Sequence, residues 1–70
     1  MTQLTEFETG YVMACANMQN LHDEPNIASD ALLELGRTKS EILSGFEWSE
    51  YDRDALKTIF DQSGSDWEQQ

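Results

Sequence analysis

The chain has 70 residues, with 14 Asp and Glu against 4 Lys and Arg and a formal net charge of −10 at pH 7. A negative field of this size repels nucleic acid and anionic membranes, and it attracts basic protein surfaces. Seventy residues form one domain at most, and a hydrophobic content of 39% is enough for a modest core.

The single cysteine, Cys15, excludes an internal disulfide and is typical of a reducing compartment. No apolar run approaches the roughly 20 residues that span a bilayer. The N-terminus lacks the basic and apolar regions of a signal peptide. We therefore expect a cytoplasmic protein.

A capping box marks the start of the first predicted helix, which we expect from about Glu6 to Leu21. Thr5 stands three residues before Glu8, so each side chain can bind the other residue's backbone N–H. Spacings of three and four predict that one face packs on the core, formed by Phe7, Tyr11, Ala14, Cys15, Met18 and Leu21. A second apolar strip implies either a central position for this helix or a dimer contact, and it consists of Val12, Met13 and Ala16.

A second helix is predicted after Pro25, with Asn26 as its cap and Gly36 as its end. Its apolar face is expected to contain Ile27, Ala28, Ala31, Leu32 and Leu35. Leu33 lies away from that face and is expected to be exposed.

A second capping box, Thr38 and Glu41, predicts a short helix that passes through Leu43 and ends near Gly45. Ser49 is expected to cap the last helix, from about Glu50 to Gln62. Its inward face is predicted to contain Ala55, Leu56, Ile59 and Phe60. The expected fold is all-α, a compact small bundle of three main helices and one short helix in residues 1–63, followed by a flexible acidic tail, residues 64–70.

Metal binding and catalysis find little support in the residues. One Cys and one His fall short of the four ligands of a structural zinc site. The Asp52–Asp54 stretch lacks the Gly and closing Glu of a calcium loop. Cys15 lies on an apolar helix face, where a thiol is more often inert, and no glycine-rich phosphate loop is present. We expect no metal, no cofactor and no enzymatic activity.

Residues 32–42 resemble a helix-turn-helix, with Gly36 at the turn. In that family the second helix reads DNA, and Arg37 and Lys39 stand at its start. The resemblance departs where Leu32 takes a position often held by Ala, and the second helix is short. Two basic residues also supply too small a footprint for phosphates. The alternative function is therefore a transcription regulator of this type, or a helical adaptor acting by protein–protein contact.

Two groups of carboxylates are the candidate contacts for a basic partner. The first group lies in and before the last helix, with Trp48 as an aromatic anchor, and contains Glu47, Glu50, Asp54 and Asp61. The second group is Asp30 and Glu34. Asp52 is discounted because its expected role is helix capping. Such carboxylates can stand in for the phosphates of a duplex, or they can form only a solvated face. Trp67, in the predicted tail, is either a docking anchor or part of a frayed end.

In size, charge and helical content the whole chain resembles the small acidic proteins that phages encode to block host defences, including anti-CRISPR proteins and DNA mimics. The resemblance rests on no motif and assigns no residue. It implies an inhibitor in the host cytoplasm that occupies the basic nucleic-acid-binding surface of a defence effector. The expected partner is then a basic protein surface, without direct contact with nucleic acid or membrane. A homodimer through the first helix is a further expectation.

Overall fold

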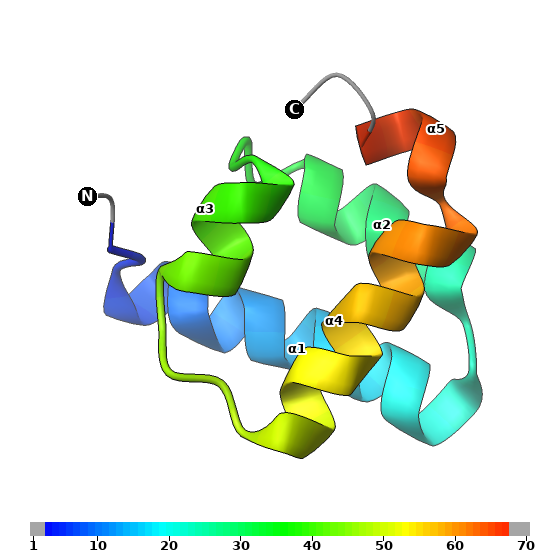
Figure 1. The fold of residues 1–70 in the computed structure, drawn as a ribbon, viewed down its shortest axis with the longest axis horizontal. Helices are drawn as coiled ribbons and strands as arrows, with labels where there is room; N and C mark the ends of the chain where they lie inside the picture. The colour runs from blue at the N-terminus through cyan, green and yellow to red at the C-terminus, as the bar shows by residue number, and fades with distance from the viewer. Residues whose placement is uncertain (1–2, 68–70) are drawn as a thin grey trace.

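The computed structural model describes residues 3–67, apart from the side chains of residues 65 and 66. The regular elements of this part of the chain are all helices, joined by short turns, and it contains no strand (Figure 1). Its elements are α1 Glu6–His22, α2 Pro25–Leu33, α3 Lys39–Ser44, α4 Glu50–Gln62 and α5 Gly64–Trp67. The predicted all-α bundle of three main helices and one short helix is confirmed, and α5 adds one more turn. None of these helices has the length and apolar content needed to cross a membrane.

Of the four predicted helices, three begin where the local sequence predicts. Both capping boxes form, since Thr5 and Glu8 bind each other's backbone N–H, as do Thr38 and Glu41. The Ser49 hydroxyl accepts from the backbone N–H of Asp52. These contacts satisfy backbone donors that have no partner inside a helix.

The predicted cap at Asn26 is wrong. Helix α2 begins at Pro25, two residues before the start that a cap at Asn26 would give, and its N-cap Glu24 makes no side-chain cap hydrogen bond. Proline suits the first helical position because its fixed φ is already helical and its missing N–H would have no partner there. Asn26 instead accepts a hydrogen bond from the Ser63 hydroxyl at 3.0 Å, which ties α2 to the end of α4.

The core lies where α1, α2 and α4 meet, and α3 packs on α4. It is formed by Val12, Cys15, Ala16, Ala28, Leu32, Ile42, Trp48, Ala55, Leu56, Ile59, Phe60 and Trp67. The inward face predicted for α4 is confirmed at all four positions. Leu33 is exposed as expected, whereas Ile27, predicted to be inside, is 56% exposed.

The predicted core face of α1 is wrong at three of its six positions, Phe7, Ala14 and Leu21. Phe7 and Leu21 are 72% and 71% exposed, and the buried residues of α1 are Val12, Cys15 and Ala16. The reason is that α2 and α4 both pack on α1, and their positions select the Val12–Ala16 side. Phe7, Ala14 and Leu21 are therefore left at the surface. Of the other predicted positions, Cys15 is buried, and Tyr11 and Met18 are partly buried and pack against the core.

The tail predicted from residue 64 is also wrong as far as residue 67. Gly64–Trp67 form α5, and Trp67 is only 1% exposed. Its indole N–H donates to the Ser29 hydroxyl at 2.9 Å, and its ring meets that of Phe60 edge to face at 4.7 Å. Burying a large aromatic ring with its polar atom satisfied stabilises the last helical turn. Residues 68–70 of the predicted tail lie outside the described residues.

Two glycines are required by the backbone. Helix α2 ends at Leu33 rather than at Leu35, and Gly36 adopts a left-handed φ of 78° in the turn that follows. Gly45 ends α3, where an added Cβ would lie 2.6 Å from the Glu41 carbonyl oxygen and 2.6 Å from Leu4 Cγ. The Gly45 carbonyl also accepts from the Leu4 N–H, so the segment before α1 passes directly across the end of α3.

Candidate protein-binding surface

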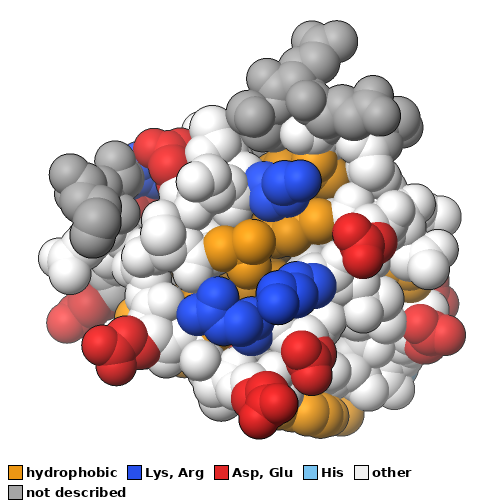
Figure 2. Space-filling model, in the orientation of Figure 1, with side chains coloured by type: hydrophobic (Ala, Val, Ile, Leu, Met, Phe, Trp, Pro, Cys, Tyr) orange, Lys and Arg blue, Asp and Glu red, His pale blue; other side chains and the backbone are white. Residues whose placement is uncertain are grey.

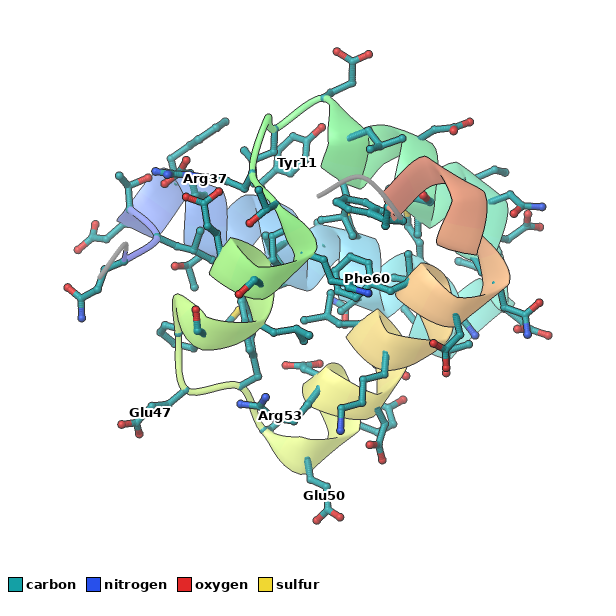
Figure 3. The ribbon with its side chains drawn as sticks, turned by 45° about the horizontal axis from the view of Figure 1, so that its top comes forward. Tyr11, Arg37, Glu47, Glu50, Arg53 and Phe60 are labelled. Atoms are coloured by element: carbon teal, nitrogen blue, oxygen red, sulfur yellow. The ribbon has the colours of Figure 1, made fainter. Side chains whose placement is uncertain are left out.

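The predicted contact residues fall on three separate parts of the fold. Asp30 lies on α2 and Glu34 caps the C-terminus of that helix, both exposed. Glu47 lies in the connection before α4, and α4 itself carries the remaining exposed carboxylates, Glu50, Asp54 and Asp61. In Figure 3, Glu47 and Glu50 project from the body in different directions.

Trp48, predicted as an aromatic anchor for a partner, is part of the core. Its side chain is 6% exposed, and its indole N–H donates to the Ile42 carbonyl at 2.8 Å. The Phe46 ring covers it at a centroid distance of 4.9 Å. This tryptophan ties the α3–α4 connection to α3 and lies in the core, so it is not an exposed anchor for a partner.

The carboxylates of α4 share their side of the helix with basic residues. Glu50, Asp54 and Asp61 follow one another at four and seven positions, which places them on one strip. Lys57 lies in the same strip, three positions after Asp54 and four before Asp61, and Arg53 lies beside it. The first predicted group of carboxylates is therefore partly neutralised by its own helix.

Basic side chains gather on the α3–α4 face. Lys39 of α3 and Arg53 of α4 line an open groove of about 670 Å³, together with Leu43, Phe46 and Trp48. Lys57 follows Arg53 by one helical turn. Figure 2 shows this face, with Lys and Arg atoms around apolar atoms in the middle and acidic side chains spaced along the margin. The sequence does not reveal this cluster because Lys39 lies 14 positions before Arg53 and on another helix.

The fourth basic residue, Arg37, is held in a structural cluster beside the first turn of α1 (Figure 3). Its guanidinium donates to Glu8 from Nε at 2.7 Å and from Nη2 at 3.0 Å. Its Nη1 lies 3.6 Å from Glu41 Oε2. These contacts with Arg37, together with the Thr5 N–H, lower the pKa of Glu8 to about 2.

This arrangement leaves a set of exposed carboxylates without an ion-pair partner among the described residues. Residues 1–36 contain no Lys or Arg. Within the described residues, no ion pair reaches five exposed carboxylates on α1, on α2 and at their ends, which we call the α1–α2 acidic surface: Glu6, Asp23, Glu24, Asp30 and Glu34. The second predicted group of contacts, Asp30 and Glu34, belongs to this surface, and the missing bases are its signal in the sequence.

Two other features considered from the sequence are the metal ligands and Cys15. No group of three or more His, Cys, Asp or Glu in this range is placed to hold a metal ion. Burial raises the pKa of Cys15 to about 11, which keeps it a thiol at neutral pH. In the helix-turn-helix interpretation, the second helix would be the six residues of α3, and Arg37 at its start is engaged by two glutamates.

Comparisons with protein-family models, with curated proteins and with solved structures find no match to this chain.

Proposed function

We propose that this chain is a small acidic binding protein that inhibits a nucleic-acid-binding protein by occupying its basic surface. The α1–α2 acidic surface makes the contact, and the mechanism is steric and electrostatic, without turnover. The resemblance to phage inhibitors implies that the partner is a defence effector of the host, as it is for anti-CRISPR proteins and DNA mimics.

The observation that carries the proposal is the uneven distribution of charge. Three of the four basic residues, Lys39, Arg53 and Lys57, lie on α3 and α4, and the fourth is bound by Glu8 and Glu41. The α1–α2 side thus presents carboxylates whose field is not cancelled locally. Such a surface accelerates encounter with a basic partner and can compete with the phosphates of a duplex.

The predicted contacts are revised accordingly. Asp30 and Glu34 remain central contacts, and Glu24 joins them at the N-terminal end of α2. Glu47, Glu50, Asp54 and Asp61 become secondary, because Arg53 and Lys57 would face the same basic partner and repel it. Trp48 is removed from the contact set because it is buried.

The test compares two triple variants that each remove three negative charges. One carries Glu24→Gln, Asp30→Asn and Glu34→Gln, and the other carries Glu50→Gln, Asp54→Asn and Asp61→Asn. Each chain is immobilised and exposed to the heparin-binding fraction of a bacterial lysate. Bound protein is then eluted with a short DNA duplex at constant ionic strength, and a parallel column receives buffer without DNA.

We expect the wild type to retain proteins that the duplex releases. The variant with the three α2 substitutions at Glu24, Asp30 and Glu34 should retain at least about tenfold less of these proteins. The α4 variant should stay close to the wild type. Retention should also fall steeply with salt, because the Debye length shrinks from about 8 Å at 0.15 M to about 3 Å at 1 M. Equal loss in both variants, or no release by the duplex, would contradict the proposal. Gel retardation of a duplex by the isolated chain would favour the helix-turn-helix regulator instead.

A further inference from the structure

The open groove on the α3–α4 face is not used by the proposed function. It has a volume of about 670 Å³, and its apolar lining comes from Leu43, Phe46 and Trp48. Phe46 is 42% exposed, although its ring packs on the buried Trp48 ring at a centroid distance of 4.9 Å. The Trp48 indole N–H is itself fixed on the Ile42 carbonyl at 2.8 Å. The groove therefore presents an apolar surface whose rings are already held in place.

Basic side chains border this apolar surface on both helices. Lys39 of α3 and Arg53 of α4 line the groove, and Lys57 follows Arg53 by one helical turn. Figure 2 shows Lys and Arg atoms on both sides of the apolar atoms of this face. Among the described residues no ion pair reaches any of these three cations, although acidic residues outnumber basic ones by 14 to 4 in the whole chain. Their positive charge is therefore available to a ligand.

The carboxylates nearest to these cations in the chain do not neutralise them by contact. Glu47 also lines the groove, but in Figure 3 its side chain projects outward, away from Arg53. Glu50 and Asp54 neighbour Arg53 on α4 and form no ion pair with it. The lining thus holds two cations against one anion, and Lys57 adds a further positive charge beside it.

The lining indicates the chemistry of its occupant. The cations suit carboxylates, and the Arg53 guanidinium can donate two parallel hydrogen bonds to one of them. Leu43 and Phe46 suit a large apolar side chain, which a run of phosphates or a small inorganic anion does not supply. Because the groove is open, it cannot enclose a small molecule as ordinary ligand pockets do. An extended acidic peptide can lie along it, and recognition of acidic motifs by basic clusters is a recurrent mode of peptide binding.

We propose that this groove binds an acidic segment of another protein that carries a large apolar side chain. The apolar side chain lies against Leu43 and Phe46. The flanking carboxylates pair with Lys39, Arg53 and Lys57. The net charge of −10 repels such a segment at long range, so binding depends on contacts within a Debye length of about 8 Å. No residue of the α1–α2 acidic surface lines the groove, so this proposal and the proposed function can fail separately.

Fluorescence anisotropy of labelled peptides tests the site on the full chain. The probe is a capped peptide with three Asp or Glu residues on each side of a central Leu-Phe pair. One control peptide has serine in place of Leu and Phe, and the other has amides in place of the acids. We expect a dissociation constant of about 10–300 µM for the probe, and at least about tenfold weaker binding of each control. No binding of the probe up to about 1 mM, or equal binding of either control, would overturn the proposal.

A matched pair of double variants tests whether the cations of the lining hold the peptide. Lys39→Gln with Arg53→Gln removes both of them. Asn17→Asp with Gln62→Glu, at exposed positions of α1 and α4, is the control because it makes the net charge more negative by the same amount. We expect the first variant to bind the probe at least about tenfold more weakly and the control less than about threefold more weakly. Circular dichroism should show an intact helical fold in both, and equal weakening would overturn the proposal.

Proton–nitrogen correlation NMR of the wild type locates the peptide. We expect the probe to shift signals of residues 39–48 and 53–57, and shifts confined to α1 and α2 would overturn the proposal. A short DNA duplex at the same concentration should leave these signals in place. If the duplex shifts them as strongly as the probe does, the groove is a phosphate site and the proposal is wrong.

Different substitutions separate this site from the proposed function. Glu24→Gln, Asp30→Asn and Glu34→Gln together should leave the probe bound at least as tightly as the wild type binds it, because they reduce the overall repulsion. Lys39→Gln with Arg53→Gln should leave the retention of duplex-released proteins close to that of the wild type. Loss of probe binding in the α2 variant would overturn a separate site at the groove.

Discussion

Arg37 donates two hydrogen bonds to the carboxylate of Glu8 across 29 positions of the chain. Glu8 also accepts from the Thr5 N–H and so completes the cap of α1. The same guanidinium lies 3.6 Å from Glu41, which completes the cap of α3. One cation therefore fixes the first turns of two helices relative to each other, and this structural role removes Arg37 from the bases that could bind a phosphate.

Glu8→Gln should make stability less dependent on acid pH. The pKa of Glu8 is held at about 2 by Arg37 and the Thr5 N–H, whereas an unfolded glutamate titrates near 4.5. A lowered pKa means that the stabilisation is complete above about pH 4.5 and is lost as the pH falls toward 2. We expect the thermal midpoint of the wild type to exceed that of Glu8→Gln at pH 7. The difference between the two midpoints should shrink as the pH falls from about 4.5 toward 2.

Glu6→Gln is the control for this experiment. Glu6 is exposed, lies in the same helical turn and has no ion pair within the described residues. Its substitution should leave most of the acid dependence in place. An unchanged gap between wild type and Glu8→Gln from pH 7 to pH 2 would contradict the role of this pair.

Trp67→Ala should destabilise the fold although it lies near the end of the chain. The residue is 1% exposed and contacts Phe60 and Ser29. Its removal is expected to cost about 3 kcal/mol, as for other large core truncations. Trp67→Phe retains a ring but leaves the Ser29 hydroxyl without its donor, which should cost about 1 kcal/mol. Urea unfolding followed by circular dichroism measures both, and a loss below about 0.5 kcal/mol for Trp67→Ala would show that α5 does not stabilise the core.

Alanine at two glycines should have effects of opposite sign. In Gly45→Ala, the new Cβ would meet the Glu41 carbonyl and Leu4 at 2.6 Å, so we expect a loss of about 1–3 kcal/mol. In Gly10→Ala, the Cβ meets nothing, and we expect a gain of up to about 1 kcal/mol in dilute protein. Urea midpoints of the two variants measured side by side check this, and a stabilised Gly45→Ala would refute the close approach at the end of α3.

Cys15 should react slowly with a thiol reagent in the native protein. It is 2% exposed, and burial raises its pKa to about 11. At pH 8 we expect labelling to be at least about 100-fold slower than in urea, because thiolate and access both require opening of the fold. The raised pKa also predicts that stability falls as the pH rises from about 9 to about 11. The Leu21→Cys variant, studied at low protein concentration, supplies an exposed thiol for comparison. Equal labelling rates at position 21 and at Cys15 would contradict the burial of Cys15.

The sequence determined the features whose causes are local. Thr5, Thr38 and Ser49 each bind a backbone N–H within their own first turn, so the starts of three helices can be recognised from neighbouring residues. Helix α4 separates apolar from polar residues cleanly, and its buried face was predictable for that reason. The net charge and the absence of bases before Arg37 also follow from the sequence alone.

Tertiary structure decided the features that depend on distant partners. Helix α1 has two apolar sides, and only the packing of α2 and α4 selects the one that is buried. Trp67 donates a hydrogen bond to Ser29, which lies 38 positions away in the sequence. The acidic residues next to Trp67 in the sequence do not indicate this contact. Lys39 and Arg53 line the same groove, whereas Arg37 is held apart from both by Glu8. The distances between these charges are set by the folded chain and cannot be read from their spacing in the sequence.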